Sequence, residues 1–426
     1  NGGVHVNSGI PNKAAYLLAE SLGREKLGQI YYRVLDSRYL NATSGFTDMR
    51  LAVLQAIVDL YGEDTEEFVS AEMAFDKVGI TGDDELVGVE PEVLPAIKGE
   101  EWVAVVNAEN SDTSLYLVRP NLQGSDDIVQ LTKTQVFDET GNAITISGDG
   151  SYLFFVDESN FIRGINIDGS NEEILSNEGD WSSISLSPDG TKLAATSVFE
   201  DSTIFIFDLV NPEKSIEMKL YNPTTQDGIQ SKTVLFADAL DWDISGRYLV
   251  YDAYNAVRAS DKNSGYWDIA MLDVENRLIF SLFAALPEGV HMGNPSFAQT
   301  NPRYLAFDFH DASSEQYALG VADLFENEVG ILLDTDASFS FPRFSVDDNH
   351  IVFETFKDKR YRVYQLPMAE NRLAAVEAPK PFLEDAQSAT WFAIGSRPDV
   401  ETALEERFLN QLPSQLSLEQ NFPNPF

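Results

Sequence analysis

A strand–turn–strand unit recurs six times along residues 99–395, and this recurrence constrains the fold more than any other feature. Five copies are clear, ITISGDGSYLFFV, ISLSPDGTKLAAT, LDWDISGRYLVYD, PSFAQTNPRYLAF and PRFSVDDNHIVFE, and GEEWVAVV is a fainter sixth. The anchor positions in the second strands are 40 to 56 residues apart: Trp102, Tyr152, Lys192, Tyr248, Tyr304 and His350. Such spacing is typical of a β-propeller in which each repeat is one four-stranded blade. We therefore expect an all-β six-bladed propeller over residues 99–395.

The end of this region predicts how the propeller closes. The segment QSATWFAIGS reads as an isolated innermost strand, whereas EWVAVVNAEN, TSLYLVRP and DDIVQLT read as a blade that lacks one. We expect residues 387–394 to pair beside the strand of Trp102, because closure removes strand edges that would otherwise template aggregation.

Residues 1–80 have a helical period instead, with apolar residues three and four positions apart in four segments. Ser8 or Asn7 is the expected N-cap of a first helix that runs through Ala19, and Thr47 is the expected N-cap of the third. Gly79 is expected to end the fourth, which follows the acidic EDTEE. The inward positions of the last three helices are Leu27, Ile30, Tyr31, Val34, Leu35, Met49, Ala52, Val53, Ala56, Ile57, Leu60, Phe68, Ala71, Phe75 and Val78. The chain is thus expected to be multidomain, with an all-α helical lobe over residues 1–80 followed by the propeller.

The charge of the chain restricts its partners. The 426 residues include 29 Lys and Arg against 69 Asp and Glu, which gives a net charge of −40. Such an excess repels nucleic acids and anionic membranes, so no nucleic acid partner is expected. There are no cysteines, which excludes disulfides, thiolate metal ligands and cysteine nucleophiles. The sequence has no apolar run of about 18 residues, so no transmembrane segment is expected.

Four segments of residues 1–80 resemble the C-terminal helical lobe of the thermolysin family of zinc metallopeptidases: NGGVHVNSGIPNKAAYLLAE, REKLGQIYYRVL, LNATSGFTDMRLAVLQAIVDLYG and AFDKVGI. In that family the histidine of the opening motif hydrogen-bonds the oxyanion that forms when water attacks a peptide carbonyl. By position this histidine is His5. An imidazole N–H at that place would stabilise the new negative charge. The resemblance therefore implies a catalytic role for His5 and a protein or peptide substrate.

The zinc site of that family is missing from this sequence. It needs H-E-x-x-H on a helix and a distant Glu, and the chain has no such motif and only four histidines, His5, His291, His310 and His350. The Asp that precedes the family's opening motif is also not included. We therefore expect zinc only in the full-length enzyme, with calcium as a further candidate, and an upstream catalytic half of the same polypeptide as partner. The 426-residue chain alone is expected to be inactive.

Two groups of propeller residues allow either a functional or a structural interpretation. Four aspartates on turns are candidate calcium ligands: Asp149, Asp189, Asp243 and Asp347. Four tryptophans are candidates for lining a carbohydrate groove: Trp181, Trp242, Trp267 and Trp391. We favour the structural interpretation of both groups, because turn carboxylates usually cap their own turns and strand tryptophans usually fill the space between blades. No site is assigned to His291 or His310.

The segments that flank the propeller are also informative. Residues 81–98, TGDDELVGVEPEVLPAIK, contain several acids and two prolines without a clear period, which predicts a linker or a packed extended strap. Within the propeller, SPDGTKLA resembles the repeat of TolB-like propellers, which supports the fold and not a function. Residues 396–426 include LSLEQNFPNPF, which resembles the start of the C-terminal sorting domain of type IX secretion. That resemblance implies a secreted or outer cell-surface protein.

Two functions from different classes stay open. The first is a secreted thermolysin-like zinc metalloendopeptidase, of which this chain is the downstream part, with a propeller that binds substrate, a partner or a surface. The second is a non-catalytic structural or adhesive extracellular propeller protein with a remnant peptidase lobe. An H-E-x-x-H motif upstream of Asn1 decides for the first. We favour the first because residues 1–80 keep His5 and its turn.

The charge also predicts that stability depends on salt. Forty excess negative charges repel one another in the folded state, and 0.1 M salt screens that repulsion beyond about 10 Å. We expect the melting temperature in scanning calorimetry to rise between low and moderate NaCl concentrations. A constant melting temperature would show that the charges are already compensated.

Overall fold

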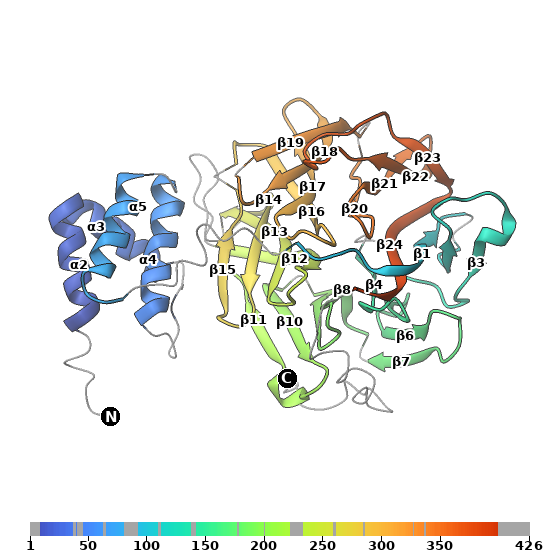
Figure 1. Cartoon of the computed structure of the whole chain (residues 1–426), viewed down its shortest axis with the longest axis horizontal. Coiled ribbons are helices and arrows are strands. Elements are labelled where there is room, and N and C mark those ends of the chain that lie inside the picture. The colour runs from blue at the N-terminus through green and yellow to red at the C-terminus, as the bar shows by residue number, and fades with distance from the viewer. Residues whose placement is uncertain are drawn as a thin grey trace.

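The computed structural model of the chain consists of four helices followed by a six-bladed β-propeller (Figure 1). The structure describes residues 9–36, 40, 46–62, 65–80, 93–109, 112–137, 142–176, 179–199, 201–221, 233–258, 261–283, 286–326, 328–335 and 338–398. The predicted fold class, an all-α lobe followed by an all-β six-bladed propeller, is confirmed. In the described residues, every helix is too short or too polar to cross a bilayer.

The four helices are α2 (Gly9–Leu22), α3 (Arg24–Asp36), α4 (Phe46–Tyr61) and α5 (Glu66–Asp76). Thr65 caps α5, because its hydroxyl accepts a hydrogen bond from the N–H of Phe68, and Glu66 and Glu67 favour the positive end of the helix dipole. Gly79 then adopts φ 78°, a conformation that suits glycine at a helix end. The helices bury one shared core: Ala14, Leu18, Ile30, Val34, Ala52, Val53, Leu54, Ala56, Ile57, Phe68, Ala71, Ala74, Phe75 and Ile80.

Three details of the helical prediction are wrong. Thr47 does not precede α4 as its cap but lies inside the first turn, since the helix begins at Phe46. Leu35 is 75% exposed and Leu60 is 42% exposed, because both lie in the last turn of their helices, beyond the shared core. The first helix also extends past Ala19 to Leu22. The expected caps Ser8 and Asn7 lie outside the described residues.

A buried arginine ties α4 to the end of α5. Arg50 is 1% exposed, and its guanidinium donates to the carboxylate of Asp76 at 2.6 Å and to the carbonyl of Ile80 at 3.2 Å. A buried cation of this kind is costly unless it is paired, so these bonds hold the last helix in place against the third.

Each blade is a four-stranded antiparallel sheet whose first strand lies nearest the axis. Blade 1 is β24 (Ala386–Ser396), β1 (Lys98–Asn107), β2 (Leu115–Val118) and β3 (Ile128–Gln130). Blade 2 is β4 (Ile144–Ile146), β5 (Tyr152–Val156), β6 (Ile162–Asn166) and β7 (Glu173–Ser176). Blade 3 is β8 (Trp181–Leu186), β9 (Lys192–Ser197), β10 (Thr203–Asp208) and β11 (Ile216–Lys219).

The last three blades follow the same order. Blade 4 is β12 (Thr233–Trp242), β13 (Tyr248–Arg258), β14 (Asp261–Asp273) and β15 (Leu278–Ser281). Blade 5 is β16 (Val290–Phe297), β17 (Tyr304–Asp311), β18 (Gln316–Asp323) and β19 (Glu328–Asp334). Blade 6 is β20 (Arg343–Phe344), β21 (His350–Lys357), β22 (Arg360–Pro367) and β23 (Lys380–Glu384). All six predicted anchors therefore lie in the second strand of a blade.

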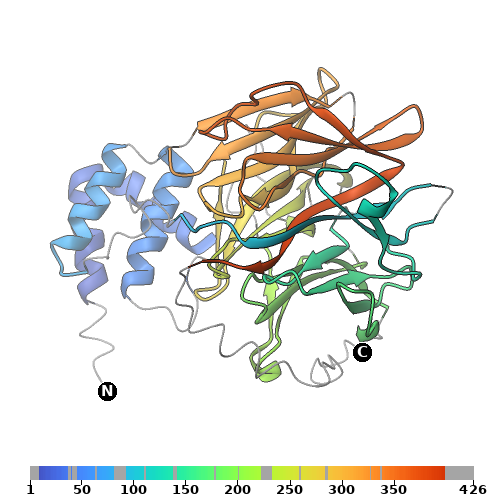
Figure 2. The ribbon, with the colours of Figure 1, turned by 45° about the vertical axis from the view of Figure 1, so that its right-hand side comes forward.

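The two ends of the propeller meet in blade 1, as the sequence predicts. The strand β24 pairs antiparallel with β1 from Lys98 opposite Ser396 to Asn107 opposite Ala386, and Trp102 lies opposite Phe392. Figures 1 and 2 show the red C-terminal strand running beside the first strand of the propeller. The indole N–H of Trp391 adds a hydrogen bond of 2.9 Å to the carboxylate of Glu101.

The segment before β1 is held against the propeller. The N–H of Leu94 donates to the carbonyl of Thr300 at 2.8 Å, and the Arg397 guanidinium donates to the carbonyls of Pro95 and Gln299. Residues 93–97 are thus a packed strap, and residues 81–92 lie outside the described residues. Figure 1 shows the helical bundle beside blade 4, where Tyr221 and Met271 pack against its core.

The closing pair of strands approaches too closely for a side chain at one position. A Cβ on Gly99 would lie 1.9 Å from the carbonyl oxygen of Ile394, so Gly99→Ala must separate β1 from β24. We expect this change to cost about 1–3 kcal/mol, the usual range for overpacking, and to lower the melting temperature. Gly124→Ala is the control, because nothing lies within 4 Å of its Cβ position. Equal melting temperatures of the two variants would contradict this account of closure.

Candidate functional site

The residue predicted to be catalytic, His5, lies outside the described residues, so its placement stays a prediction. Across the described ranges, no three His, Asp or Glu side chains are grouped so that they could hold a metal ion. The described part of the chain therefore does not fit a zinc site. The other three histidines all lie on propeller strands, His291 on β16, His310 on β17 and His350 on β21.

The four turn aspartates cap their own turns, which is the structural interpretation we favoured. The carboxylate of Asp149 accepts from the hydroxyls of Ser147 and Ser151, and Asp189 repeats this arrangement with Ser187 and Thr191. Burial opposes ionisation of Asp149, but the hydrogen bonds from the two serines outweigh it and lower its pKa. These carboxylates use their oxygen atoms within the turn, and this explains their recurrence without a bound cation.

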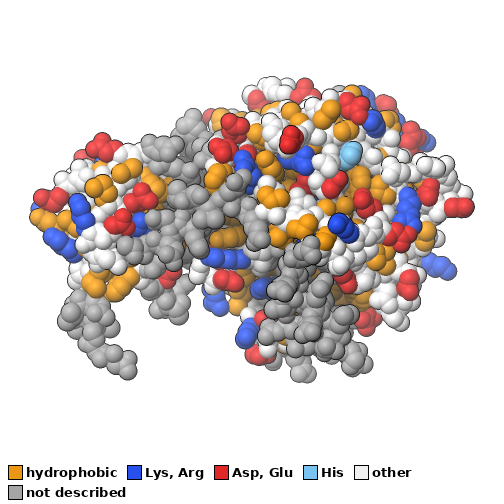
Figure 3. Space-filling view, viewed as in Figure 1, with side chains coloured by type: hydrophobic (Ala, Val, Ile, Leu, Met, Phe, Trp, Pro, Cys, Tyr) orange, Lys and Arg blue, Asp and Glu red, His pale blue; other side chains and the backbone are white. Residues whose placement is uncertain are grey.

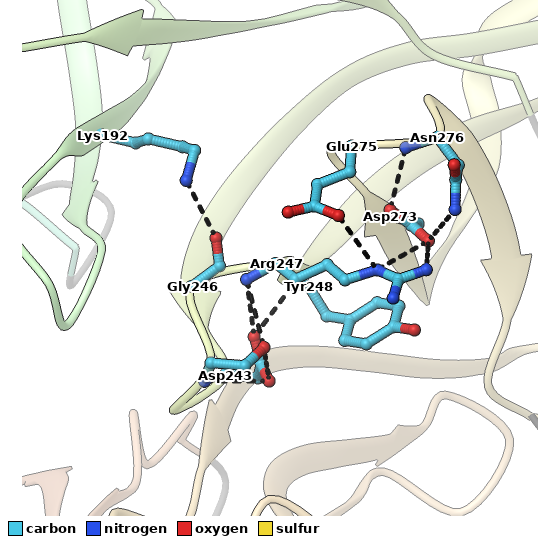
Figure 4. A network of polar contacts seen from close by, with 9 residues as sticks. Lys192, Asp243, Gly246, Arg247, Tyr248, Asp273, Glu275 and Asn276 are labelled. Atoms are coloured by element: carbon cyan, nitrogen blue, oxygen red, sulfur yellow. Dashed lines mark hydrogen bonds and ion pairs between the residues drawn. The ribbon is translucent and has the colours of Figure 1, made fainter. Parts of the chain in front are cut away.

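Asp243 belongs to a larger network at the turn between β12 and β13 (Figure 4). Its carboxylate accepts from the N–H groups of Arg247 and Tyr248, and burial raises its pKa despite these bonds. The Arg247 guanidinium reaches the next turn of the same blade and pairs with Asp273 at 2.7 Å. In blade 5 the equivalent arginine, Arg303, pairs with Asp323. The same arginine–aspartate ion pair thus links neighbouring strands in blades 4 and 5.

Three of the four tryptophans fill the propeller interior. The indole N–H of Trp181 donates to the Ser176 hydroxyl, that of Trp242 donates to the Ser185 carbonyl, and both rings are buried. Trp391 is buried as well, beside the axis. Trp267 differs, because its ring is only half-buried at the opposite end of blade 4.

Among the described residues, a cavity lies on the propeller axis, and all six innermost strands contribute to its wall. Its volume is about 190 Å³, which is room for several waters or a small polar molecule. It opens at the end that carries the aspartate turns, where Ile97 of the strap and Arg397 border it. Arg343 and Asp241 supply a cation and a carboxylate to the same wall.

Arg343 is one of two arginines in the wall of this cavity, and the other is Arg397. Its Nη2 lies 2.6 Å from the side-chain amide oxygen of Asn142, and its Nη1 donates to the Pro342 carbonyl. Burial lowers the pKa of Arg343, whereas the charges of Asp241, Asp308 and other buried carboxylates oppose this shift. Burial raises the pKa of Asp241, although Arg343 and the N–H of Phe297 favour its charged form. The wall of the cavity thus carries one carboxylate, that of Asp241, and two guanidinium groups, those of Arg343 and Arg397.

Three buried carboxylates at equivalent positions join blades 4, 5 and 6 to the blade that follows each of them. Each stands four residues after an anchor. Each accepts a backbone N–H from a residue with positive φ that lies in, or directly before, an innermost strand: Asp252 from Asn294 at 2.7 Å, Asp308 from Phe341 at 3.0 Å and Glu354 from Ser388 at 2.5 Å. By accepting these N–H groups, the carboxylates satisfy buried donors that would be costly without a hydrogen bond.

Asp252 has a like-charged neighbour in Asp238. Burial raises the pKa of Asp252 to about 6, against hydrogen bonds from Asn294 and Ala239. Burial and the nearby Asp252 charge raise the pKa of Asp238 well above its ordinary value, so the pair holds a proton near neutral pH.

Sequence reasoning missed these buried carboxylates, although the sequence contains a pattern that predicts them. Alignment of the six anchors places Asp252, Asp308 and Glu354 at one common position, where the other repeats have Val106, Val156 and Thr196. A carboxylate inside an otherwise apolar strand predicts a buried polar partner. What that partner is follows only from the fold.

Comparison with known proteins divides the chain into two parts. Residues 1–80 match the family model described as the thermolysin metallopeptidase alpha-helical domain. Bacillolysin of Bacillus caldolyticus is 48% identical over 90 residues, which is 19% of this chain and 16% of that protein. The extracellular elastase of Staphylococcus epidermidis is 50% identical over 80 residues, 19% of this chain and 15% of that protein. The chain therefore spans about one-sixth of the length of these relatives.

The propeller resembles a solved structure of TolB from Acinetobacter baumannii. The TM-score is 0.51 at 15% sequence identity, and the match covers 77% of this chain and 73% of that chain. At this identity the likeness shows the fold alone. The expected resemblance to TolB-like propellers is confirmed at that level.

The raised pKa of Asp252 predicts how stability depends on pH. Because the folded protein binds this proton more tightly than the unfolded chain, the contribution is complete below pH about 4 and is lost as the pH rises through about 6. We expect Asp252→Asn to flatten the fall in the free energy of unfolding between about pH 4 and about pH 6, measured by urea titration. Asp149→Asn is the control and should keep the wild-type slope, since its lowered pKa titrates below this range. Identical slopes for wild type and Asp252→Asn would contradict the assignment.

Proposed function

We propose that this chain is the downstream part of a secreted zinc metalloendopeptidase, whose propeller binds substrate, a partner or a surface. The observation that carries the proposal is the match of residues 1–80 to the thermolysin helical domain, together with 48–50% identity to bacillolysin and the staphylococcal elastase. Such identity over a whole helical domain supports a shared architecture there. The zinc ligands would lie in an upstream half, since the described residues do not fit a zinc site.

In this proposal His5 is the catalytic residue that this chain contributes. When water adds to the scissile peptide carbonyl, the carbonyl oxygen becomes an oxyanion, and the imidazole N–H of His5 donates a hydrogen bond to it. A donor placed at the oxyanion stabilises the transition state more than the neutral substrate and so raises turnover. The helical lobe of residues 1–80 would form one wall of the cleft that holds the protein or peptide substrate.

Secretion belongs to the same proposal. The elastase relative is named as an extracellular protein, and LSLEQNFPNPF in residues 396–426 resembles the start of a type IX sorting domain. We place the domain boundaries at 1–80 for the lobe, 81–98 for the connecting segment and 99–395 for the propeller. Fusion of a reporter to residues 396–426 together with the complete sorting domain tests the export route. Retention of that reporter inside the cell would contradict it.

A non-catalytic structural or adhesive protein is the alternative. It is favoured by one observation, the absence of any H-E-x-x-H motif from the 426 residues. The sequence upstream of Asn1 distinguishes the two functions, because the peptidase requires that motif and the adhesive protein does not.

The test of the peptidase is made on the full-length protein. His5→Ala should lower the turnover number for casein by about 10²–10³, because one oxyanion donor is lost, while the zinc content by mass spectrometry stays at the wild-type value. His350→Ala is the matched control and should keep wild-type turnover, since His350 stacks on Trp391 inside the propeller. The 426-residue chain alone should cleave no casein and bind no stoichiometric zinc. Unchanged turnover of His5→Ala, or zinc-dependent cleavage by this chain alone, would overturn the proposal.

A further inference from the structure

Seven aromatic or imidazole rings gather at the end of blades 4 and 5 that lies opposite the aspartate turns. We call them the ring cluster. They come from β12, β13 and β14 of blade 4, from β16, β17 and β18 of blade 5, and from the segment before β20: Phe236, Tyr254, Trp267, His291, His310, Tyr317 and Phe339. Six are half-buried, and Phe339 is 40% exposed. Each residue of the cluster is therefore partly accessible to solvent.

The rings form two rows that cross the strands of each blade. In blade 4 the Tyr254 and Trp267 rings are 5.4 Å apart, and Phe236 lies 5.4 Å from Trp267. In blade 5 the His310 ring stacks on Tyr317 at 4.1 Å and lies 5.5 Å from His291. Such cross-strand pairs support the sheet, but they do not by themselves require rings at the solvent edge.

One hydrogen bond joins the two rows of rings and determines which nitrogen of His291 carries the proton. The backbone N–H of Trp267 donates to Nδ1 of His291 at 3.2 Å, so Nδ1 has no proton and Nε2 carries it. An imidazole in this tautomer is a donor at Nε2 and does not offer a lone pair there to a metal ion. Burial lowers the pKa of His291, and the neighbouring His310 lowers it further, so the ring stays neutral. The cluster thus gains no positive charge from His291.

The surroundings of the cluster in blade 5 are acidic. Between Leu278 and Pro342 the sequence contains one basic residue of the Lys/Arg type, Arg303, which lies at the opposite end of blade 5 and pairs with Asp323. At the cluster end, Asp311 and Glu315 flank His310 and Tyr317 in the β17–β18 turn. The Ser313 hydroxyl donates to Asp311 and lowers its pKa, which keeps this carboxylate charged.

Blade 6 provides an internal comparison. Phe356 stands at the position equivalent to Tyr254 and His310, six residues after its anchor, and its ring lies 4.7 Å from Tyr361. The turn between these two rings contains Lys357, Lys359 and Arg360. The turn also contains Asp358, and Arg360 pairs with Glu384 at 3.5 Å and with Asp385 at 3.7 Å. The same pair of rings is therefore repeated in a less acidic setting, which attracts a cationic ligand less.

We propose that the ring cluster of blades 4 and 5 is a binding site for a basic polypeptide segment, whose arginine side chains stack on the rings. Ring faces attract guanidinium groups, and the attraction is stronger where acidic groups add a negative potential. The net charge of −40 favours the approach of such a segment. The proposal deepens the propeller part of the proposed function, and it is independent of the peptidase part.

The test is a titration of the full 426-residue chain at 150 mM NaCl with acetyl-tetra-arginine amide. The four histidines allow a local readout, the ¹³Cε1–H resonances of selectively labelled histidine. We expect the His291 and His310 resonances to shift and that of His350, at the far end on Trp391, to stay in place. The tetra-citrulline analogue has the same shape without the charge and should cause no shift.

Two variants assign the binding to the cluster. Tyr317→Leu keeps an apolar side chain but removes the ring next to His310, and it should weaken binding about tenfold. Phe356→Leu in blade 6 is the matched control and should bind as the wild type does; melting temperatures verify that both variants fold. The proposal is overturned if tetra-arginine shifts neither cluster histidine, if citrulline shifts them equally, or if both variants lose binding alike. Shifts caused by maltohexaose and not by tetra-arginine would assign the cluster to a neutral glycan instead and would also overturn it.

Discussion

The pairing of β24 with β1 is the interaction on which the rest of the propeller depends. A propeller is a ring of sheets, and every blade packs its faces on two neighbours, so the ring is complete only when its first and last segments meet. Here the closing contact is an antiparallel ladder from Lys98 to Asn107, and it shares one blade between the two ends of the repeat region. Closure also gives β24, the innermost strand of blade 1, a hydrogen-bonded neighbour.

Closure of the ring also brings together the segment before β1 and the segment after β24. Because β1 begins and β24 ends at the same side of blade 1, Arg397 can hold Pro95 of the strap and Gln299 of blade 5 together. The strap then runs past the mouth of the axial cavity, where Ile97 and Arg397 form part of the wall. The entrance to the cavity is thus formed in part by the residues directly before β1 and directly after β24.

Buried carboxylates supply a second set of constraints between blades. Asp252, Asp308 and Glu354 each accept hydrogen bonds from a kinked innermost strand of the following blade. Burying a carboxylate is costly unless it accepts hydrogen bonds, and burying a backbone N–H is costly unless it donates one. Each carboxylate and the N–H groups at its kink therefore satisfy one another. Burial is the main reason why the Asp238–Asp252 pair retains a proton, and the negative charges of neighbouring carboxylates add to it. Figure 3 shows acidic side chains scattered among basic and apolar ones on the visible face of both the helical lobe and the propeller.

Much of the fold follows from sequence, because the features that predict it are local. The six anchors, the closing segment and the aspartate turns are each defined within about a dozen residues, and the structure confirms them. Leu35 was misassigned because a helical period shows which residues share a face and not how far a neighbouring helix extends. The axial cavity and the ring cluster could not be predicted, since their residues come from five or more strands that only the closed ring brings together. Arg343, Asp241 and Asn142 are distant in sequence and meet at the axis.

The central claim is that closure in blade 1 makes the six blades one cooperative unit, and native-state hydrogen exchange measures this most directly. The account predicts that the amides of β24 and β1 exchange with the same opening free energy as those of β12 and β16, the innermost strands of blades 4 and 5, with all four equal to the global free energy of unfolding. Exchange of β24 and β1 at a clearly lower free energy, while β12 and β16 stay protected, would show that the ring persists without its closing pair and would contradict the account.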